Sequence, residues 1–291
     1  MDIKCITDAR ALLGESPVWS PEDNAVYWID ILGKKLHRTS LNNPETRTWD
    51  LPGYPGMIAL RRKGGLVIAL QDGIYGFNPQ TAELDLLVAL EADILENRPN
   101  DGKCDEAGRL WLGTMNTVDA SRATGNFYRI DPDLTVTMIK SACRIPNGLA
   151  WTPENTVMYH TDTRGGVVWS YVFDPISGDC SEEREFFRFN RTKTGGVDGA
   201  AMDEEGGYWA ALYGGRKLIR ILPDGEPGTE IQLPISQPTM PAFGGPDMRT
   251  LFITSARQKL DYETLLSEPL AGGLLAVTVG FQGHQVYPFG G

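Results

Sequence analysis

The sequence has no long apolar run; none reaches the roughly eighteen residues that a membrane-spanning helix needs. Its first residues, MDIKCITDAR, lack the basic start and apolar stretch of a signal peptide. Cysteine is scarce, and no two of the four cysteines form a C-x-x-C pair (Cys5, Cys104, Cys143, Cys180). These absences disfavour a membrane protein, a disulfide framework and a thiolate zinc site, so we expect a protein of the reducing cytoplasm.

Positive charge is also in deficit. Lys and Arg number 27 against 38 Asp and Glu, a net charge of −11, which disfavours nucleic acid and anionic membranes as partners. The three histidines (His37, His160, His284) lack the H-E-x-x-H spacing of zinc proteases, and no G-x-S-x-G motif of a serine hydrolase occurs. We interpret His160 as a satisfied structural residue. The acidic run 203–205 is interpreted as an exposed turn.

Helical periodicity is nearly absent as well, and the clearest helix candidate, residues 261–270, is short. What the chain does contain is a series of short β-rich runs separated by Gly, Pro, Asn and Asp. Each copy reads as a small or apolar strand, a polar turn, an aromatic-rich strand, a second turn and an alternating strand. The copies recur at intervals of about forty to fifty residues and start at Ser16, Gly56, Asn100, Asn147, Asp198 and Met240.

Six such copies predict an all-β fold, a six-bladed β-propeller forming a single domain over residues 1–291. One small sheet cannot cover both of its own faces, so neighbouring sheets stack around an axis and each face becomes core. We expect the strand from Ile3 to Thr7 to pair with the last blade and close the ring. The space between blades should be filled by large second-strand residues, namely Trp28, Leu70, Trp111, Tyr159, Trp209 and Phe252.

Polar residues stand where the innermost strands of several copies begin. Asn147 begins the fourth copy in IPNGLAW, Asp198 holds the corresponding place in the fifth, and Asn100-Asp101 and Glu15 lie at the third and first. An Asn-Gly pair taken alone is most often a turn. In a propeller, however, these starts surround the axis on one face, where carboxylate and amide oxygens suit a divalent cation. From the residues alone, a metal site and a plain polar pore both remain open.

Five ordered motifs carry a resemblance over essentially the whole chain: LGESPVWS, RPNDGKCDEAGRLWLGTM, IPNGLAWTP, VDGAAMDEEGGYWAA and PAFGGPDMRTLFITSA. In these the sequence resembles the gluconolactonase/regucalcin (senescence marker protein) family. The segments YHTDT, FGGPDMRTLFITSARQKL and ETLLSEPLAGGLLAV are most similar to bacterial sugar-acid lactonases, such as xylonolactonase and arabinonolactonase.

The resemblance implies a six-bladed propeller with one divalent metal on the axis. It implies that Glu15, Asn147 and Asp198 are the ligands and that Arg98 and Asn100 contact the substrate. Asp101 then lies near the water shell of the metal. Some relatives carry an acidic residue soon after GTM, but here Asn116 to Asp119 follow, so whether Asn116 or Asp119 contacts the substrate is open.

The implied function is metal-dependent hydrolysis of an aldonic-acid sugar lactone, a pentono- or hexonolactone, to the free sugar acid. Asp198 is the candidate general base that activates water. Ca²⁺, Mg²⁺, Mn²⁺, Zn²⁺ and Fe²⁺ all remain possible metals, and the lactone and its ring size are not specified. The alternatives are a calcium-binding regulatory or scaffold propeller and a hydrolase of a non-sugar ester. We expect a monomer.

Overall fold

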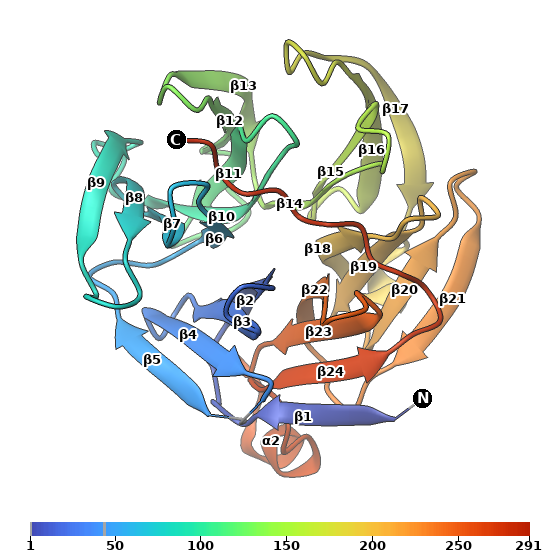
Figure 1. Ribbon diagram of the computed structural model, residues 1–291. Helices are drawn as coiled ribbons and strands as arrows, with labels where there is room; N and C mark the ends of the chain where they lie inside the picture. Colours follow the sequence, from blue (N-terminus) through green and yellow to red (C-terminus); the bar gives the residue numbers. More distant parts are fainter. Residues whose placement is uncertain (1, 43–44) are drawn as a thin grey trace.

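In this computed structural model, which describes residues 2–42 and 45–291, the strands form six four-stranded antiparallel sheets. The sheets stand side by side around a central axis, with the innermost strand of each next to that axis (Figure 1). The predicted six-bladed β-propeller is confirmed. Its axis positions the site, because each innermost strand starts at the same end of the ring.

The first three blades follow the chain in order. The first comprises β2 (Gly14–Ser20), β3 (Ala25–Asp30), β4 (Lys35–Ser40) and β5 (Thr46–Asp50). The second comprises β6 (Met57–Leu60), β7 (Leu66–Leu70), β8 (Gly73–Phe77) and β9 (Leu84–Ala89). The third comprises β10 (Asn97–Cys104), β11 (Leu110–Asn116), β12 (Gly125–Ile130) and β13 (Val136–Cys143).

The other three blades repeat this order until the last strand. The fourth comprises β14 (Pro146–Trp151), β15 (Val157–Asp162), β16 (Val167–Phe173) and β17 (Cys180–Arg188). The fifth comprises β18 (Gly196–Met202), β19 (Tyr208–Tyr213), β20 (Lys217–Ile221) and β21 (Pro227–Gln232). The sixth comprises β22 (Pro238–Gly244), β23 (Thr250–Ser255), β24 (Leu274–Thr278) and, from the other end of the chain, β1 (Ile3–Thr7).

Strand β1 closes the ring as the sequence predicts. It pairs antiparallel with β24, with Ile3 opposite Val277 and Cys5 opposite Leu275. The outer edge of the sixth blade is therefore built from the N-terminal residues, which joins the two ends of the repeat series.

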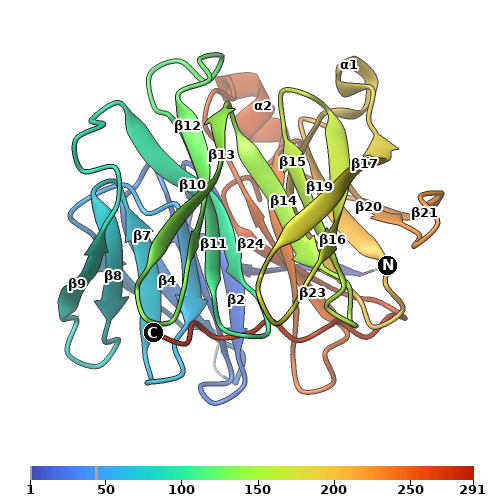
Figure 2. The same cartoon turned by 90° about the horizontal axis from the view of Figure 1, so that it is seen from above.

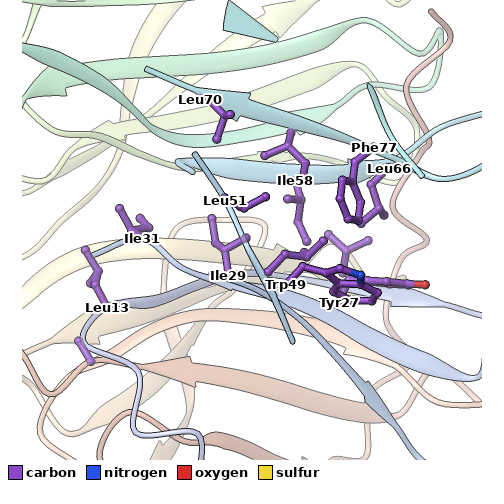
Figure 3. Close-up of a cluster of buried hydrophobic side chains, with 14 residues drawn as sticks. Leu13, Tyr27, Ile29, Ile31, Trp49, Leu51, Ile58, Leu66, Leu70 and Phe77 are labelled. Carbon is purple, nitrogen blue, oxygen red and sulfur yellow. The ribbon is translucent and has the colours of Figure 1, made fainter. Parts of the chain in front are cut away.

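The large second-strand residues fill the space between blades, which confirms that prediction. Trp28, Trp111 and Trp209 have no exposed surface, and the corresponding residues of the other blades are also buried. Figure 3 shows the core between the first two blades, where Ile29 and Ile31 face Ile58 and Leu70. Burial of such apolar side chains is the main force that holds adjacent blades together.

One predicted exposed turn is wrong in part. Asp203 is fully buried, whereas its two glutamate neighbours are exposed. Its carboxylate accepts hydrogen bonds from Arg220 Nε at 2.6 Å and Trp209 Nε1 at 2.8 Å. Asp105 binds Trp111 in the same way in the third blade. A buried carboxylate needs such partners, so this aspartate is a structural element of the blade.

Two short helices lie on the face where the innermost strands start (Figure 2). Helix α2 (Tyr262–Ser267) is shorter than the predicted 261–270; Asp261 caps its start, and it ends shortly before Pro269. Helix α1 (Arg191–Thr194) is not anticipated by the sequence analysis. Among the described residues, no helix has the length and apolarity needed to cross a membrane.

The C-terminal segment crosses the opposite face (Figures 1 and 2). The His284 N–H donates to Met202 O at 2.9 Å, and Phe289 is fully buried against the second and third blades. Residues 284–287 line a cavity of about 60 Å³ at that end of the axis, together with the far ends of the innermost strands. The tail thus covers this end, and the polar residues predicted for the site lie at the other.

Candidate functional site

The residues predicted for the site converge on the axis. Glu15, Arg98, Asn147 and Asp198 are each at least nine-tenths buried, although they come from four different blades. Asn147 Nδ2 donates to Asp198 Oδ1 at 2.8 Å, and Asn100 Nδ2 donates to Asn147 Oδ1 at 3.1 Å. Residues up to 51 positions apart in sequence are therefore in direct contact.

Register shifts of the β-bulge kind turn these side chains toward the axis. Among the described innermost strands, all but β6 contain one. Glu15 and Asn147 are the last paired residues before the bulge, whereas Asp198 is the first residue within it, after Val197. The prediction that Asp198 and Asn147 hold the same place is thus wrong by one residue. Because a bulge re-aims side chains, both positions reach the axis.

Thr163 determines which way the amide of Asn147 faces. The Thr163 hydroxyl donates to Val197 O at 2.7 Å, so its oxygen can only accept from Asn147, at 2.7 Å. Because the Thr163 oxygen must accept, the Asn147 atom beside it has to be the donor Nδ2, which also donates to Asp198. Asn147 Oδ1 therefore points away from Thr163; it accepts from Asn100 Nδ2, and its second lone pair is available to a cation.

Gly148 allows the chain to turn directly behind Asn147. Its φ of 65° lies in the left-handed region, and a Cβ there would stand 2.4 Å from the hydroxyl of Tyr208. The Gly148 carbonyl accepts a hydrogen bond from that hydroxyl at 2.7 Å. A side chain would collide with this contact, so the Asn-Gly pair is both a turn and a part of the site.

The site holds more acid than base. Burial raises the pKa of Glu15 well above its usual range, and the charges of Asp198 and Asp101 add to the effect. Burial and Asp101 likewise raise the pKa of Asp198. The cations beside it are Arg98, whose pKa burial lowers to about 10 against the attraction of Glu15 and Asp198, and Lys103, which interacts with Asp101 and Glu15. These two cations do not balance three carboxylates, and a bound cation would relieve the remaining repulsion.

Asp101 and Lys103 follow Asn100 along the innermost strand β10. Asp101 Oδ2 accepts from the Leu149 N–H at 3.3 Å. Lys103 Nζ donates to Leu149 O at 3.0 Å and also to Ala200 O, and burial lowers its pKa to about 8. Both side chains bind main-chain groups of the neighbouring blades. The sequence analysis missed Lys103; a lysine inside an innermost strand is the signal that could have identified it.

The loop after β11 uses its polar groups internally. Asn116 is fully buried; Oδ1 accepts from the backbone N–H of Val118 at 3.0 Å and of Asp119 at 2.8 Å, while Nδ2 donates to Thr124. Asp119 is held by Ser121 at the surface. Asn116 therefore shapes the loop, because both polar atoms of its buried side chain bind groups of the loop itself.

Glu15, Asn147 and Asp198 offer a donor set that fits a divalent cation. Two buried carboxylates face each other, and the amide oxygen beside them is oriented by Thr163. No cluster of three or more His, Cys, Asp or Glu side chains suited to a metal occurs in the described part of the chain, so the amide is needed as a third ligand. Hard, oxygen-preferring cations match this set.

Comparison with known proteins shows the family of the chain. Residues 13–257 match the family model described as the SMP-30/Gluconolactonase/LRE-like region. The chain belongs to this family. It is 37% identical to 6-deoxy-6-sulfogluconolactonase of Pseudomonas putida, covering 97% of this chain and 96% of that protein. It is 32% identical to regucalcin of Sus scrofa, covering 99% and 98%.

Solved structures of the SMP-30/gluconolactonase family superpose closely. The calcium-binding protein regucalcin from Agrobacterium tumefaciens has a TM-score of 0.94 at 30% identity, covering 98% of this chain and 96% of that chain. A luciferin-regenerating enzyme has a TM-score of 0.90 at 28% identity, covering 99% and 98%. The predicted family is confirmed. The names of its relatives include lactone hydrolases and a calcium-binding protein.

Proposed function

We propose that this protein is a metal-dependent lactonase that hydrolyses a sugar lactone to the free sugar acid, acting as a monomer of one domain. The observation that carries the proposal is the axial cluster of Glu15, Asn147 and Asp198 beside Arg98. The family membership supports lactone hydrolysis, and the names of relatives such as 6-deoxy-6-sulfogluconolactonase support a sugar lactone.

Glu15, Asn147 and Asp198 would hold one divalent cation. When bound, such a cation polarises a carbonyl group and stabilises negative charge on its oxygen. Ca²⁺, Mg²⁺, Mn²⁺, Zn²⁺ and Fe²⁺ remain candidates, because all of them accept oxygen ligands. A regucalcin described as calcium-binding is among the similar structures, which supports a divalent metal without choosing one.

Asp198 is proposed as the general base. Its Oδ1 accepts from Asn147, while Oδ2 accepts no hydrogen bond from the described residues and is available to a water molecule. Asp198 would take one proton from water as its oxygen adds to the lactone carbonyl. The ring C–O bond then breaks, and the proton passes to the alcohol oxygen that leaves.

Arg98 and Asn100 are proposed to bind the substrate at the acyl end. Arg98 donates one N–H to Asn100 Oδ1 at 2.9 Å, which holds the guanidinium beside the amide. Its positive charge would neutralise the carboxylate formed by ring opening. Asn100 already donates to Asn147, so it couples the guanidinium to the proposed metal ligand. A scaffold propeller with a structural metal would not need a buried arginine here.

Proton release from a panel of pentono- and hexonolactones tests the proposal. Chelated protein is assayed first, and then each divalent metal is added back. We expect hydrolysis well above the spontaneous rate only after metal is restored. Absence of hydrolysis with every metal, despite measurable metal binding, would support the calcium-binding regulatory or scaffold alternative. Turnover of simple aryl or alkyl esters in preference to lactones would support the non-sugar ester alternative.

A further inference from the structure

We propose that Tyr213, Gln237 and Gln258 form a hydroxyl-recognition wall, which faces Arg98 across the axis and makes the enzyme specific for polyhydroxylated lactones. This inference rests on the proposed function and assigns the other side of the same site. None of the three residues is predicted by the sequence analysis.

Gln237 carries a buried hydrogen-bond acceptor without a donor. The residue is 7% exposed, and its Nε2 donates to Gln258 O at 3.2 Å. Its Oε1 is fully buried and has no partner among the described residues. A buried amide oxygen left unpaired loses its hydration without gaining a replacement hydrogen bond, which is unfavourable. A ligand that brings a hydroxyl group to this oxygen would supply the missing hydrogen bond.

The position of Gln237 in its blade is that of Arg98. Each residue directly precedes a proline, Pro238 or Pro99, that forms the last ladder pair before the bulge of its innermost strand. Arg98 reaches the site carboxylates from this position. The third and sixth blades are opposite each other in the ring (Figure 1), and Gln237 and Arg98 both stand where the innermost strand of their blade begins, at the site end of the axis.

Tyr213 and Gln258 extend the wall on the side of Gln237. Gln258 Nε2 donates to the Tyr213 hydroxyl at 3.3 Å. Burial raises the pKa of Tyr213 to about 12, and the charges of Asp198 and Glu15 contribute, which places the phenol near the proposed ligands. Tyr213 belongs to the fifth blade but packs against the core cluster of the first two blades, so its side chain reaches beyond its own blade.

The chemistry of this wall suits neutral hydroxyl groups. An amide oxygen accepts from a hydroxyl, and a phenol both donates and accepts. Arg98 would bind the acyl end of the lactone on one side while the sugar hydroxyls bind the wall on the other. A lactone without hydroxyl groups would leave Gln237 Oε1 unpaired and bind less well. A site built to bind a substrate hydroxyl in this way discriminates against analogues that lack it.

The test compares a hydroxylated and a plain lactone with Gln237→Met, which keeps the side-chain length and removes the amide. We expect kcat/KM for D-glucono-δ-lactone to fall by about 10- to 100-fold, mainly through KM, because a hydrogen bond to a buried group is lost. For δ-valerolactone, kcat/KM should stay within about twofold, because this substrate makes no such bond. Gln71→Met, on the same face in the second blade, is the matched control and should change neither value.

An equal fall for both lactones, or no change for either, would overturn the inference. Failure of the proposed function gives a different result, since the wild-type protein would then hydrolyse neither lactone. In that case the affinity for D-gluconate, measured by calorimetry, tests the wall without hydrolysis. Binding to wild type that weakens at least about tenfold in Gln237→Met would support the wall. Absent binding, or equal binding to both proteins, would reject it.

Discussion

At the scale of single residues, the orientation of one amide depends on one hydroxyl. Thr163 lies just beyond β15, at the end of the segment YHTDT, and it binds Asn147 on one side and Val197 O on the other. Groups that orient a metal ligand in this way contribute to affinity without touching the metal.

Thr163→Val should weaken metal binding by about 10- to 100-fold, because Asn147 loses the partner that orients its amide. Calorimetric titration with the metal that supports activity measures this. Thr161→Val, which removes a buried hydroxyl of β15 that donates to Val167 O in β16, is the matched control and should bind metal normally. Unchanged affinity in Thr163→Val would show that Asn147 is oriented without it.

Asp198→Asn should lower kcat by about 10²- to 10⁴-fold, because an amide cannot accept the proton of the attacking water. Initial rates with the best lactone, at saturating metal, measure this loss. The exposed Asp119→Asn controls for the change of charge on the same face and should keep wild-type kcat. Near-wild-type kcat in Asp198→Asn would contradict the assignment of the base.

At the scale of the element, each of two blades contains a buried aspartate that joins its turn to a tryptophan and an arginine. Asp203 does so in the fifth blade and Asp105 in the third, where Arg109 Nε donates at 2.6 Å. The blade turn is thus tied to the second strand, which carries the tryptophan into the space between blades.

Asp203→Ala should destabilise the protein by about 3–5 kcal/mol, because Arg220 would be left buried with its main partner removed. The free energy of unfolding in urea measures this. Glu205, which contacts Arg220 at 3.2 Å from the surface, is the control, and Glu205→Ala should cost less than about 1 kcal/mol. Equal small losses for both variants would mean that the buried pair contributes little.

His160 should make the protein sensitive to acid. Its ring packs at a tilt against that of Phe127 between the third and fourth blades, with 4.4 Å between the ring centroids, and burial lowers its pKa from 6.5 to about 4. Between these two pH values the unfolded chain therefore binds a proton at His160, whereas the folded chain does not. Stability is fully present above pH 6.5 and falls as the pH drops toward 4, by about 3 kcal/mol for this group.

The prediction is that His160→Leu reduces the fall in stability between pH 6.5 and pH 4. Urea unfolding across this range measures the slope. Burial also lowers the pKa of His37 to about 4, so His37 should contribute to the same dependence of stability on pH. A variant that replaces both histidines by leucine should therefore show a still smaller fall in stability. The same slope in wild type and both variants would reject this account.

The structure also corrects the expectation that His160 is satisfied, since its Nε2 is buried without a partner in the described part of the chain.

At the scale of the whole molecule, one strand joins the ends of the repeat series. Without β1, the edge of β24 would expose unpaired backbone groups, and an exposed edge invites pairing with other chains. Removal of residues 1–8 should lower Tm by at least about 5 °C and promote association. Thermal unfolding and size-exclusion chromatography measure both effects. Lys4→Ala keeps the backbone pairing and should behave as wild type; an unchanged Tm and a monomeric truncated protein would contradict the role of β1.

Much of the fold could be predicted from the sequence because the repeat is local. Each copy carries its own turns and its own large second-strand residue, so the number of blades and the residues between them follow from the pattern. Glu15, Asn147 and Asp198 were also predictable, since they stand at the starts of the innermost strands and within family motifs. Their register was predicted less well, because a bulge adds residues that the repeat pattern does not show.

The sequence by itself determined the six-bladed ring, the closing strand and the polar residues around the axis, because alternation and turn residues act over short distances. Only the tertiary structure decided what each polar side chain binds. Thr163, Lys103 and Gln237 acquire their roles from groups on other blades. Tertiary structure likewise decided that Asp203 is buried while the glutamates next to it in sequence are exposed. These properties depend on contacts between distant segments, and no local pattern encodes them.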